Sequence, residues 1–146
     1  MKKKRERELL ILGAGPGGYR AAFMAADLGL EVVLVDPEPD PGGICLYHGC
    51  IPTKALLHLA KIRRAAAAAG EMGMAFPAPE VDIGKIRRWK EGVVERLTRG
   101  LGRLAKARKI RHIRGRARFL SSREVEIETG EGERRRHDHS ARRRQR

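Results

Sequence analysis

The sequence predicts an α/β fold in which helices pack on a short parallel sheet. Two apolar runs, Glu8–Leu12 and Glu31–Val35, have the continuous hydrophobicity of parallel strands that are buried on both faces. A glycine-rich turn and a helical segment, Tyr19–Leu28, separate the two runs. The order strand, glycine turn, helix and strand predicts a nucleotide-binding unit.

The turn after the first strand reads Gly13-Ala14-Gly15-Pro16-Gly17-Gly18, a G-x-G-x-x-G. Its glycines permit a tight turn, a close backbone approach to a pyrophosphate, and close packing of the helix on the strand. Small alanines along the predicted helix let it lie close to the sheet, and Gly29 suits its end. We therefore predict a Rossmann-like dinucleotide site that uses Gly13, Gly15, Pro16, Gly17 and Gly18.

Asp36 ends the second predicted strand, 18 positions beyond Gly18. A carboxylate near this spacing accepts hydrogen bonds from a ribose and disfavours a 2′-phosphate. We include Asp36 and the following Pro37 among the predicted cofactor residues. The turn alone does not separate FAD from NAD, and a glycine turn without any ligand is the competing interpretation.

The only two cysteines, Cys45 and Cys50, have four residues between them. Two cysteines close together in a cytosolic protein indicate metal binding or redox chemistry. The spacing differs from the Cys-x-x-Cys of zinc sites, and no second cysteine pair follows. The histidines at 48, 58 and 112 complete no recognisable metal pattern, so we predict no metal. Two unpaired buried thiols are the remaining alternative.

The backbone between the cysteines decides whether they can pair. In a straight helix the Cα atoms of residues i and i+5 lie about 8–9 Å apart, whereas a disulfide needs roughly 4.4–6.8 Å. If the two cysteines pair, the segment between them cannot be a straight helix. Gly49 can relax the backbone there, and Pro52 is tolerated in the first turn of a following helix. That helix would direct its amide dipoles at Cys50 and favour a thiolate.

A dithiol can pass two electrons to a flavin that lies against it. A dinucleotide turn followed directly by two cysteines therefore favours FAD as the cofactor. Lys54, one helical turn beyond Cys50, could stabilise negative charge on the reduced ring. A solvated surface lysine is the alternative at this position.

The rest of the chain predicts a helical pair and a small β-hairpin. A helix is expected from Thr53 through Ala69, followed by a loop over residues 70–79 and a second helix that Asp82 caps, although four glycines weaken it. Strands are expected at Lys109–Ile113 and Val125–Glu128, on either side of a Ser-Ser turn. Small residues at 115 and 117 would let a ligand or backbone come close.

Composition sets the domain limits and excludes several partners. The 146 residues fit one domain, which we assign to 1–130, with 131–146 as a basic tail that we expect to be disordered. A net charge of +14 is typical of proteins that bind nucleic acid. However, aromatic residues make up only 4% of the chain and the sequence has no nucleic-acid-binding motif, so we do not expect specific binding. No apolar run spans a membrane and no secretory signal is evident, so we predict a cytoplasmic protein.

Over residues 8–130 the chain resembles the dihydrolipoamide dehydrogenase family of flavoprotein disulfide reductases. The resemblance lies in the glycine turn 13–18, in the segment 45–58 with Cys45, Cys50 and the continuation Ile-Pro-Thr-Lys-Ala-Leu-Leu-His, and in residues 104–109. Glutathione and mercuric reductases share the first motif and the cysteine spacing. The continuation after Cys50 is more similar to the lipoamide enzyme.

The resemblance implies a tightly held FAD and a redox-active Cys45–Cys50 disulfide. Cys45 would be the interchange thiol that meets lipoamide, and Cys50 the thiol that passes electrons to the flavin. The pyrophosphate would lie on the glycine turn, the ribose on Asp36, and the ring beside Cys50 and Lys54. The remaining implied cofactor contacts are Gly42, Gly43, Ile44 and the backbone of Ala117. The family reaction oxidises dihydrolipoamide with NAD⁺, in a homodimer that serves lipoyl domains of 2-oxoacid dehydrogenase or glycine cleavage complexes.

The chain departs from the family at four points. Asp36 replaces a longer glutamate, Ile44 replaces a smaller residue, and Tyr47-His48 replaces an asparagine and a small apolar residue. The family is also about three times longer, with an NAD domain and a dimerisation domain that supplies a catalytic base. We therefore expect a truncated or frameshifted product that lacks NAD-linked turnover.

Two other functions compete with this interpretation. One is a non-catalytic remnant, or a basic interaction module, in which the motifs are idle and a partner binds the tail or the helical pair. The other keeps the enzyme class but acts on a different disulfide or on mercuric ion.

Overall fold

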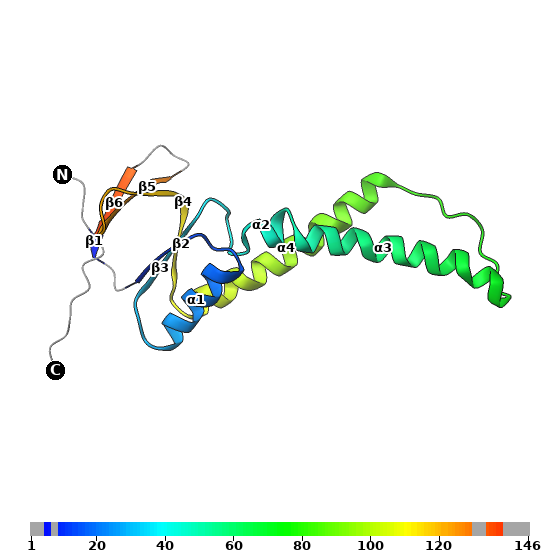
Figure 1. Ribbon diagram of the computed structural model, residues 1–146, viewed down its shortest axis with the longest axis horizontal. Coiled ribbons are helices and arrows are strands. Elements are labelled where there is room, and N and C mark those ends of the chain that lie inside the picture. The colour runs from blue at the N-terminus through cyan, green and yellow to red at the C-terminus, as the bar shows by residue number, and fades with distance from the viewer. Residues whose placement is uncertain (1–4, 7–8, 130–133, 139–146) are drawn as a thin grey trace.

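The computed structural model describes residues 5–6, 9–129 and 134–138, and describes side chains for 9–129. A sheet with one packed helix forms one end of the molecule, and two long helices project from it as an arm (Figure 1). The predicted α/β class is confirmed, as are the parallel strand pair, the helical pair and the hairpin.

The sheet has the strand order β1-β6-β5-β4-β3-β2. Its parallel part joins β2 (Leu9–Leu12), β3 (Val32–Asp36) and β4 (Arg111–Phe119), with Asp36 opposite Arg114. Its antiparallel part joins β4 to β5 (Glu124–Thr129) and β5 to β6 (Arg134–Asp138). The short β1 (Arg5–Glu6) runs parallel to β6.

All five residues of β3 are buried because the strand is covered on both faces. On one face, Leu34 packs with alanines of α1 (Pro16–Asp27) and with Ala105. On the other face, Val33 and Val35 pack against Ile127 of the hairpin. Each such buried aliphatic side chain contributes about 1.5–3 kcal/mol, so β3 is the centre of the core.

The arm consists of α3 (Cys50–Ala68) and α4 (Ile83–Ala107), which run in opposite directions and pack on each other. The single 3₁₀ turn η1 (Ala69–Met72) follows α3. Asp82 caps α4 as predicted, because its Oδ1 accepts a hydrogen bond from the Lys85 N–H at 2.9 Å. The glycines within α4 do not interrupt the helix, since its apolar face packs on α3 and the sheet.

Three differences from the prediction are larger than a shift of a strand end by one residue. Helix α1 begins at Pro16 instead of Tyr19, because Gly15 serves as its N-cap. Strand β4 continues through Gly115 to Phe119, because it leaves β3 and pairs with β5. Within the expected disordered tail, residues 134–138 form β6, paired on both edges, while 131–133 and 139–146 lie outside the described residues.

Candidate functional site

The glycine turn joins β2 to α1 and presents an open backbone surface. A Cβ at Gly18 would overlap the Gly13 carbonyl oxygen, so only glycine lets the helix approach the strand this closely. Gly13 has φ +91°, which also favours glycine. A Cβ at Gly13, Gly15 or Gly17 would meet nothing within 4 Å, so the space beside the turn is free.

The first turn of α1 has the properties of an anion site. Its N-cap, Gly15, offers no side chain to the helix amides, and Pro16 fills the first helical position. The N-terminal amides of a 12-residue helix therefore face the open surface of the glycine turn. An anion such as a pyrophosphate would have room and amide donors at this turn.

Asp36 lies at the carboxyl end of β3, directly beside this turn. Its side chain is buried, with 7% exposure, and Oδ2 accepts a hydrogen bond from the Ala14 N–H at 2.7 Å. Oδ1 accepts a second bond from the Glu38 N–H at 3.0 Å. Each oxygen retains further acceptor capacity toward a ribose hydroxyl. The carboxylate thus fixes the turn as well as standing where the ribose is expected.

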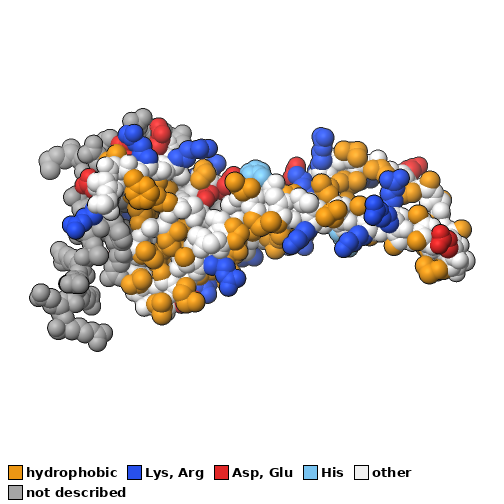
Figure 2. Space-filling model, in the orientation of Figure 1, with side chains coloured by type: hydrophobic (Ala, Val, Ile, Leu, Met, Phe, Trp, Pro, Cys, Tyr) orange, Lys and Arg blue, Asp and Glu red, His pale blue; other side chains and the backbone are white. Residues whose placement is uncertain are grey.

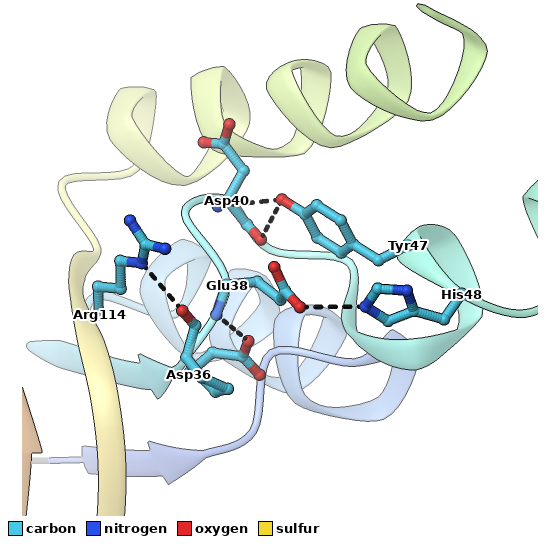
Figure 3. Close-up of polar contacts among 7 residues, drawn as sticks. Asp36, Glu38, Asp40, Tyr47, His48 and Arg114 are labelled. Atoms are coloured by element: carbon cyan, nitrogen blue, oxygen red, sulfur yellow. Dashed lines mark hydrogen bonds and ion pairs between the residues drawn. The ribbon is translucent and has the colours of Figure 1, made fainter. Parts of the chain in front are cut away.

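A five-residue strap, residues 37–41, leads from Asp36 to the cysteine segment (Figure 3). The Pro37 carbonyl accepts a hydrogen bond from Arg114 Nε at 3.0 Å, and Pro41 is fully buried. Asp40 is bound through its backbone to Tyr47 Oη, and Glu38 pairs with His48. Three prolines and these contacts make the strap a fixed connection between Asp36 and the cysteines.

The cysteine segment is docked directly on the glycine turn. The Gly42 N–H donates to the Ala14 carbonyl at 2.8 Å. Gly43 has φ +57°, and a Cβ there would come within 2.5 Å of the Gly15 Cα. The two predicted motifs, which are separated by the whole of α1 and β3, therefore touch through their backbones.

The backbone between the cysteines bends, so the segment is not one straight helix. Cys45 lies in α2 (Gly43–Tyr47), and Cys50 begins α3, with the break at His48 and Gly49. A Cβ at Gly49 would come within 3.1 Å of the Ile44 carbonyl oxygen, so glycine keeps the bend tight. Both cysteines are free thiols in this structure.

The two thiols interact with each other. The hydrogen bond with the Cys50 thiol raises the pKa of Cys45, and burial and the charge of a Cys50 thiolate act in the same direction. The Cys50 backbone N–H and the positive charge of Lys54 lower the pKa of Cys45, but the raising effects prevail. The first amide of α3 and the Lys54 cation are thus both directed at the Cys45 sulfur.

The side chains around the thiols leave this face accessible. Ile44 is 78% exposed, and Cys50 and Lys54 are also exposed. An apolar side chain beside two thiols and a cation can adjoin a flat aromatic ring, which is the neighbour that the sequence predicted.

Ala117 lies on β4, three residues beyond Arg114, the partner of Asp36 in the sheet. It packs with the core residues Val33 and Val35 and lines a cavity of about 200 Å³. The other described residues that line this cavity are Arg116, Arg118, Glu126 and Glu128. Because none of them belongs to the glycine turn, the cavity is separate from the predicted pyrophosphate site.

The three histidines considered as metal ligands have different surroundings and do not form one site. His48 pairs with Glu38, His58 is exposed on α3, and His112 is enclosed beneath the strap, where burial lowers its pKa. Within the described part of the chain, no three His, Cys, Asp or Glu side chains form a metal site. No helix among the described residues is long and apolar enough to span a membrane.

Sequence reasoning missed the residues that fix the strap. Tyr47 was identified only as a departure from a pattern, and Arg114 and His112 were not singled out for this role. Their contacts join Pro37 to Arg114 across 77 positions and Asp40 to Tyr47 within one loop. An aromatic residue with a hydroxyl inside a short segment between two cysteines was the available signal for Tyr47.

The chain matches known proteins over most of its length. A family model described as pyridine nucleotide-disulphide oxidoreductase matches residues 7–140. A dihydrolipoyl dehydrogenase of Vibrio cholerae is 46% identical over 132 residues, covering 90% of this chain and 28% of the relative. The Vibrio parahaemolyticus relative of the same name is 47% identical over 133 residues, covering 91% and 28%. The Haemophilus influenzae one is 48% identical over 122 residues, covering 84% and 26%. The chain thus spans just over a quarter of the length of these relatives.

Proposed function

Because this chain belongs to the pyridine nucleotide-disulphide oxidoreductase family, we propose that it carries the FAD-binding and dithiol part of a dihydrolipoyl dehydrogenase. The observation that carries the proposal is the docking of the cysteine segment on the glycine turn. The Gly42 amide and the Ala14 carbonyl bond at 2.8 Å, and Gly43 lies against Gly15. One cofactor can therefore lie on the turn and reach the thiols.

The chain's own residues have distinct roles in holding FAD. The amides of the glycine turn and the first turn of α1 bind the pyrophosphate, and Asp36 binds the adenosine ribose. Lys54 balances negative charge beside the thiols, and Ile44 provides an apolar contact. When bound, FAD would supply a second two-electron acceptor, which reoxidises the dithiol.

Cys45 and Cys50 exchange electrons with dihydrolipoamide through thiol–disulfide chemistry. One substrate thiolate attacks the Cys45 sulfur of the Cys45–Cys50 disulfide, and the Cys50 thiolate leaves. The second substrate thiol displaces Cys45 and closes the lipoamide disulfide. The two electrons then reside on the Cys45–Cys50 dithiol. Lys54 stabilises the thiolate that forms, since its charge lowers the pKa of Cys45.

We extend the proposal to the partners that the family resemblance implies. The substrate is the lipoyl group of a 2-oxoacid dehydrogenase or glycine cleavage complex, the final acceptor is NAD⁺, and the assembly is a homodimer. These partners belong to a protein of the relatives' length. They are tested with the product of the whole gene, by turnover of dihydrolipoamide with NAD⁺.

The first prediction is that the purified chain takes up FAD and shows a flavin spectrum. Dithionite should bleach this spectrum, and anaerobic dihydrolipoamide should bleach it in wild type but not in Cys50→Ser. Gly15→Ala should reduce uptake strongly, because its Cβ enters the open space of the pyrophosphate site. Colourless protein that refuses added FAD, or bleaching by dihydrolipoamide in Cys50→Ser, would contradict the proposal.

A further inference from the structure

The short helix that carries Cys45 is tied to the strap by one phenol group. Tyr47, two residues beyond Cys45, accepts a hydrogen bond from the Asp40 N–H at 3.2 Å. The same hydroxyl donates to the Asp40 carbonyl at 3.1 Å. One side chain thus satisfies both backbone groups of a single strap residue (Figure 3).

A residue of the arm lies beside this contact. Thr98 of α4 is 3% exposed, and its hydroxyl donates to the Val94 and Glu95 carbonyls at 3.1 and 3.2 Å. The same hydroxyl lies close enough to that of Tyr47 to act against the effect of burial on the pKa of Tyr47. Thr98 also packs toward Gly42, because a Cβ on that glycine would come within 3.2 Å of the Thr98 methyl carbon. Burial raises the pKa of Tyr47, so the phenol remains protonated and able to donate. The hydroxyl of Tyr47 therefore connects α2 to the strap at a position that Thr98 of α4 covers.

His48 adds a weaker contact on the exposed side of the same segment. Its Nε2 lies 3.3 Å from Glu38 Oε1, and the two side chains are 66% and 31% exposed. Exposed pairs of this kind contribute little to stability. Leu46 is buried as well, but Tyr47 is the polar side chain between Cys45 and Cys50 whose hydrogen bonds are partly buried.

We propose that Tyr47 is a positioning residue that holds the Cys45 thiol against Cys50 and so stabilises their disulfide relative to the dithiol. The proposal rests on the proposed function, because it concerns the same thiols. The thiols already contact each other while α2 is held. Closing the S–S bond then orders few additional groups, so the effective concentration of one thiol at the other is high. Without the hydroxyl, α2 can move away from α3, and that concentration falls.

The test measures the thiol–disulfide equilibrium of the full chain without flavin. In buffers of oxidised and reduced dithiothreitol, the two protein thiols form a disulfide while one cyclic dithiothreitol disulfide is reduced, so electrons and protons balance. The oxidised fraction is measured by alkylating the free thiols with N-ethylmaleimide and determining the mass of the protein by mass spectrometry. In Tyr47→Phe we expect the equilibrium constant for disulfide formation to fall about threefold to tenfold, the worth of a typical hydrogen bond. A tenfold fall is about a 30 mV less negative potential.

Two further variants make the result specific. Tyr19→Phe makes the same chemical change in α1, where the ring packs against Phe23, and should leave the equilibrium unchanged. Thr98→Val keeps the buried volume but removes the hydroxyl that lies beside that of Tyr47, and should shift the equilibrium in the same direction by less. If Tyr47→Phe does not fold, Thr98→Val decides.

The outcomes separate this inference from the proposed function. A folded Tyr47→Phe, or a folded Thr98→Val where it decides, with the wild-type equilibrium would overturn the positioning role alone. A wild-type chain that forms no Cys45–Cys50 disulfide in any buffer would overturn both. A shift confined to Tyr47→Phe and Thr98→Val supports the role of the hydroxyl.

Discussion

At the scale of single residues, the proton affinity of Cys45 is set by three close neighbours. The Cys50 thiol holds the proton on Cys45, whereas the Cys50 amide and Lys54 favour its loss. Because the first effect is the largest, the Cys45 thiolate forms at higher pH than an ordinary cysteine thiolate. The reactivity of Cys45 therefore depends on the protonation state of Cys50.

This balance predicts opposite effects of two substitutions. Cys50→Ala removes the hydrogen bond and the charge repulsion, so the pKa of Cys45 falls and its alkylation by iodoacetamide at pH 8 becomes several-fold faster. Lys54→Gln removes an attraction for the thiolate, so the pKa rises and alkylation slows. In each case Cys45 is followed by mass spectrometry across a pH series. Rates that change in the same direction for both variants would contradict the assigned causes.

At the scale of elements, α1 and β2 meet at a distance that only glycine allows. We predict that Gly18→Ala destabilises the chain by about 1–3 kcal/mol, because its Cβ overlaps the Gly13 carbonyl and backbone must shift. Gly92→Ala is the matched control in α4, where a Cβ meets nothing within 4 Å. It should stabilise the chain by about 0.5–1 kcal/mol. Urea unfolding followed by circular dichroism measures both, and equal midpoints for the two variants would refute the packing argument.

Elements that are determined by residues close together in the sequence could be predicted. The glycine turn, the apolar strands on either side and the bent cysteine segment each follow from residues close to one another in the chain. The length of β4 could not be predicted, because this strand pairs first with β3 and then with β5. The contacts of Tyr47 and Arg114 could not be predicted either, because they form only when the strap lies across the end of β3 and beside α4. For the same reason the orphaned Nε2 of His112, which has no hydrogen-bond partner among the described residues, had no sequence signal.

At the scale of the whole molecule, apolar side chains are exposed along the arm. Figure 2 shows hydrophobic side chains along the visible surface of the arm, interspersed with lysines and arginines. At its far part, from η1 to the start of α4, five large apolar side chains are each more than half exposed: Met72, Met74, Phe76, Val81 and Ile83. Such a concentration within 12 residues exceeds the scattered exposure of an ordinary surface.

We therefore predict that the isolated chain self-associates, through apolar contact and against its net charge of +14. Raising the salt concentration screens the repulsion and should strengthen association. Phe76→Ser combined with Met74→Ser should weaken it without loss of stability, because both side chains are exposed. Leu28→Ser, an equally exposed leucine beyond the end of α1, serves as the control and should leave association unchanged. Sedimentation velocity over a concentration series measures the effect. A single monomeric species at every concentration and salt would show that the arm surface is stable in water alone.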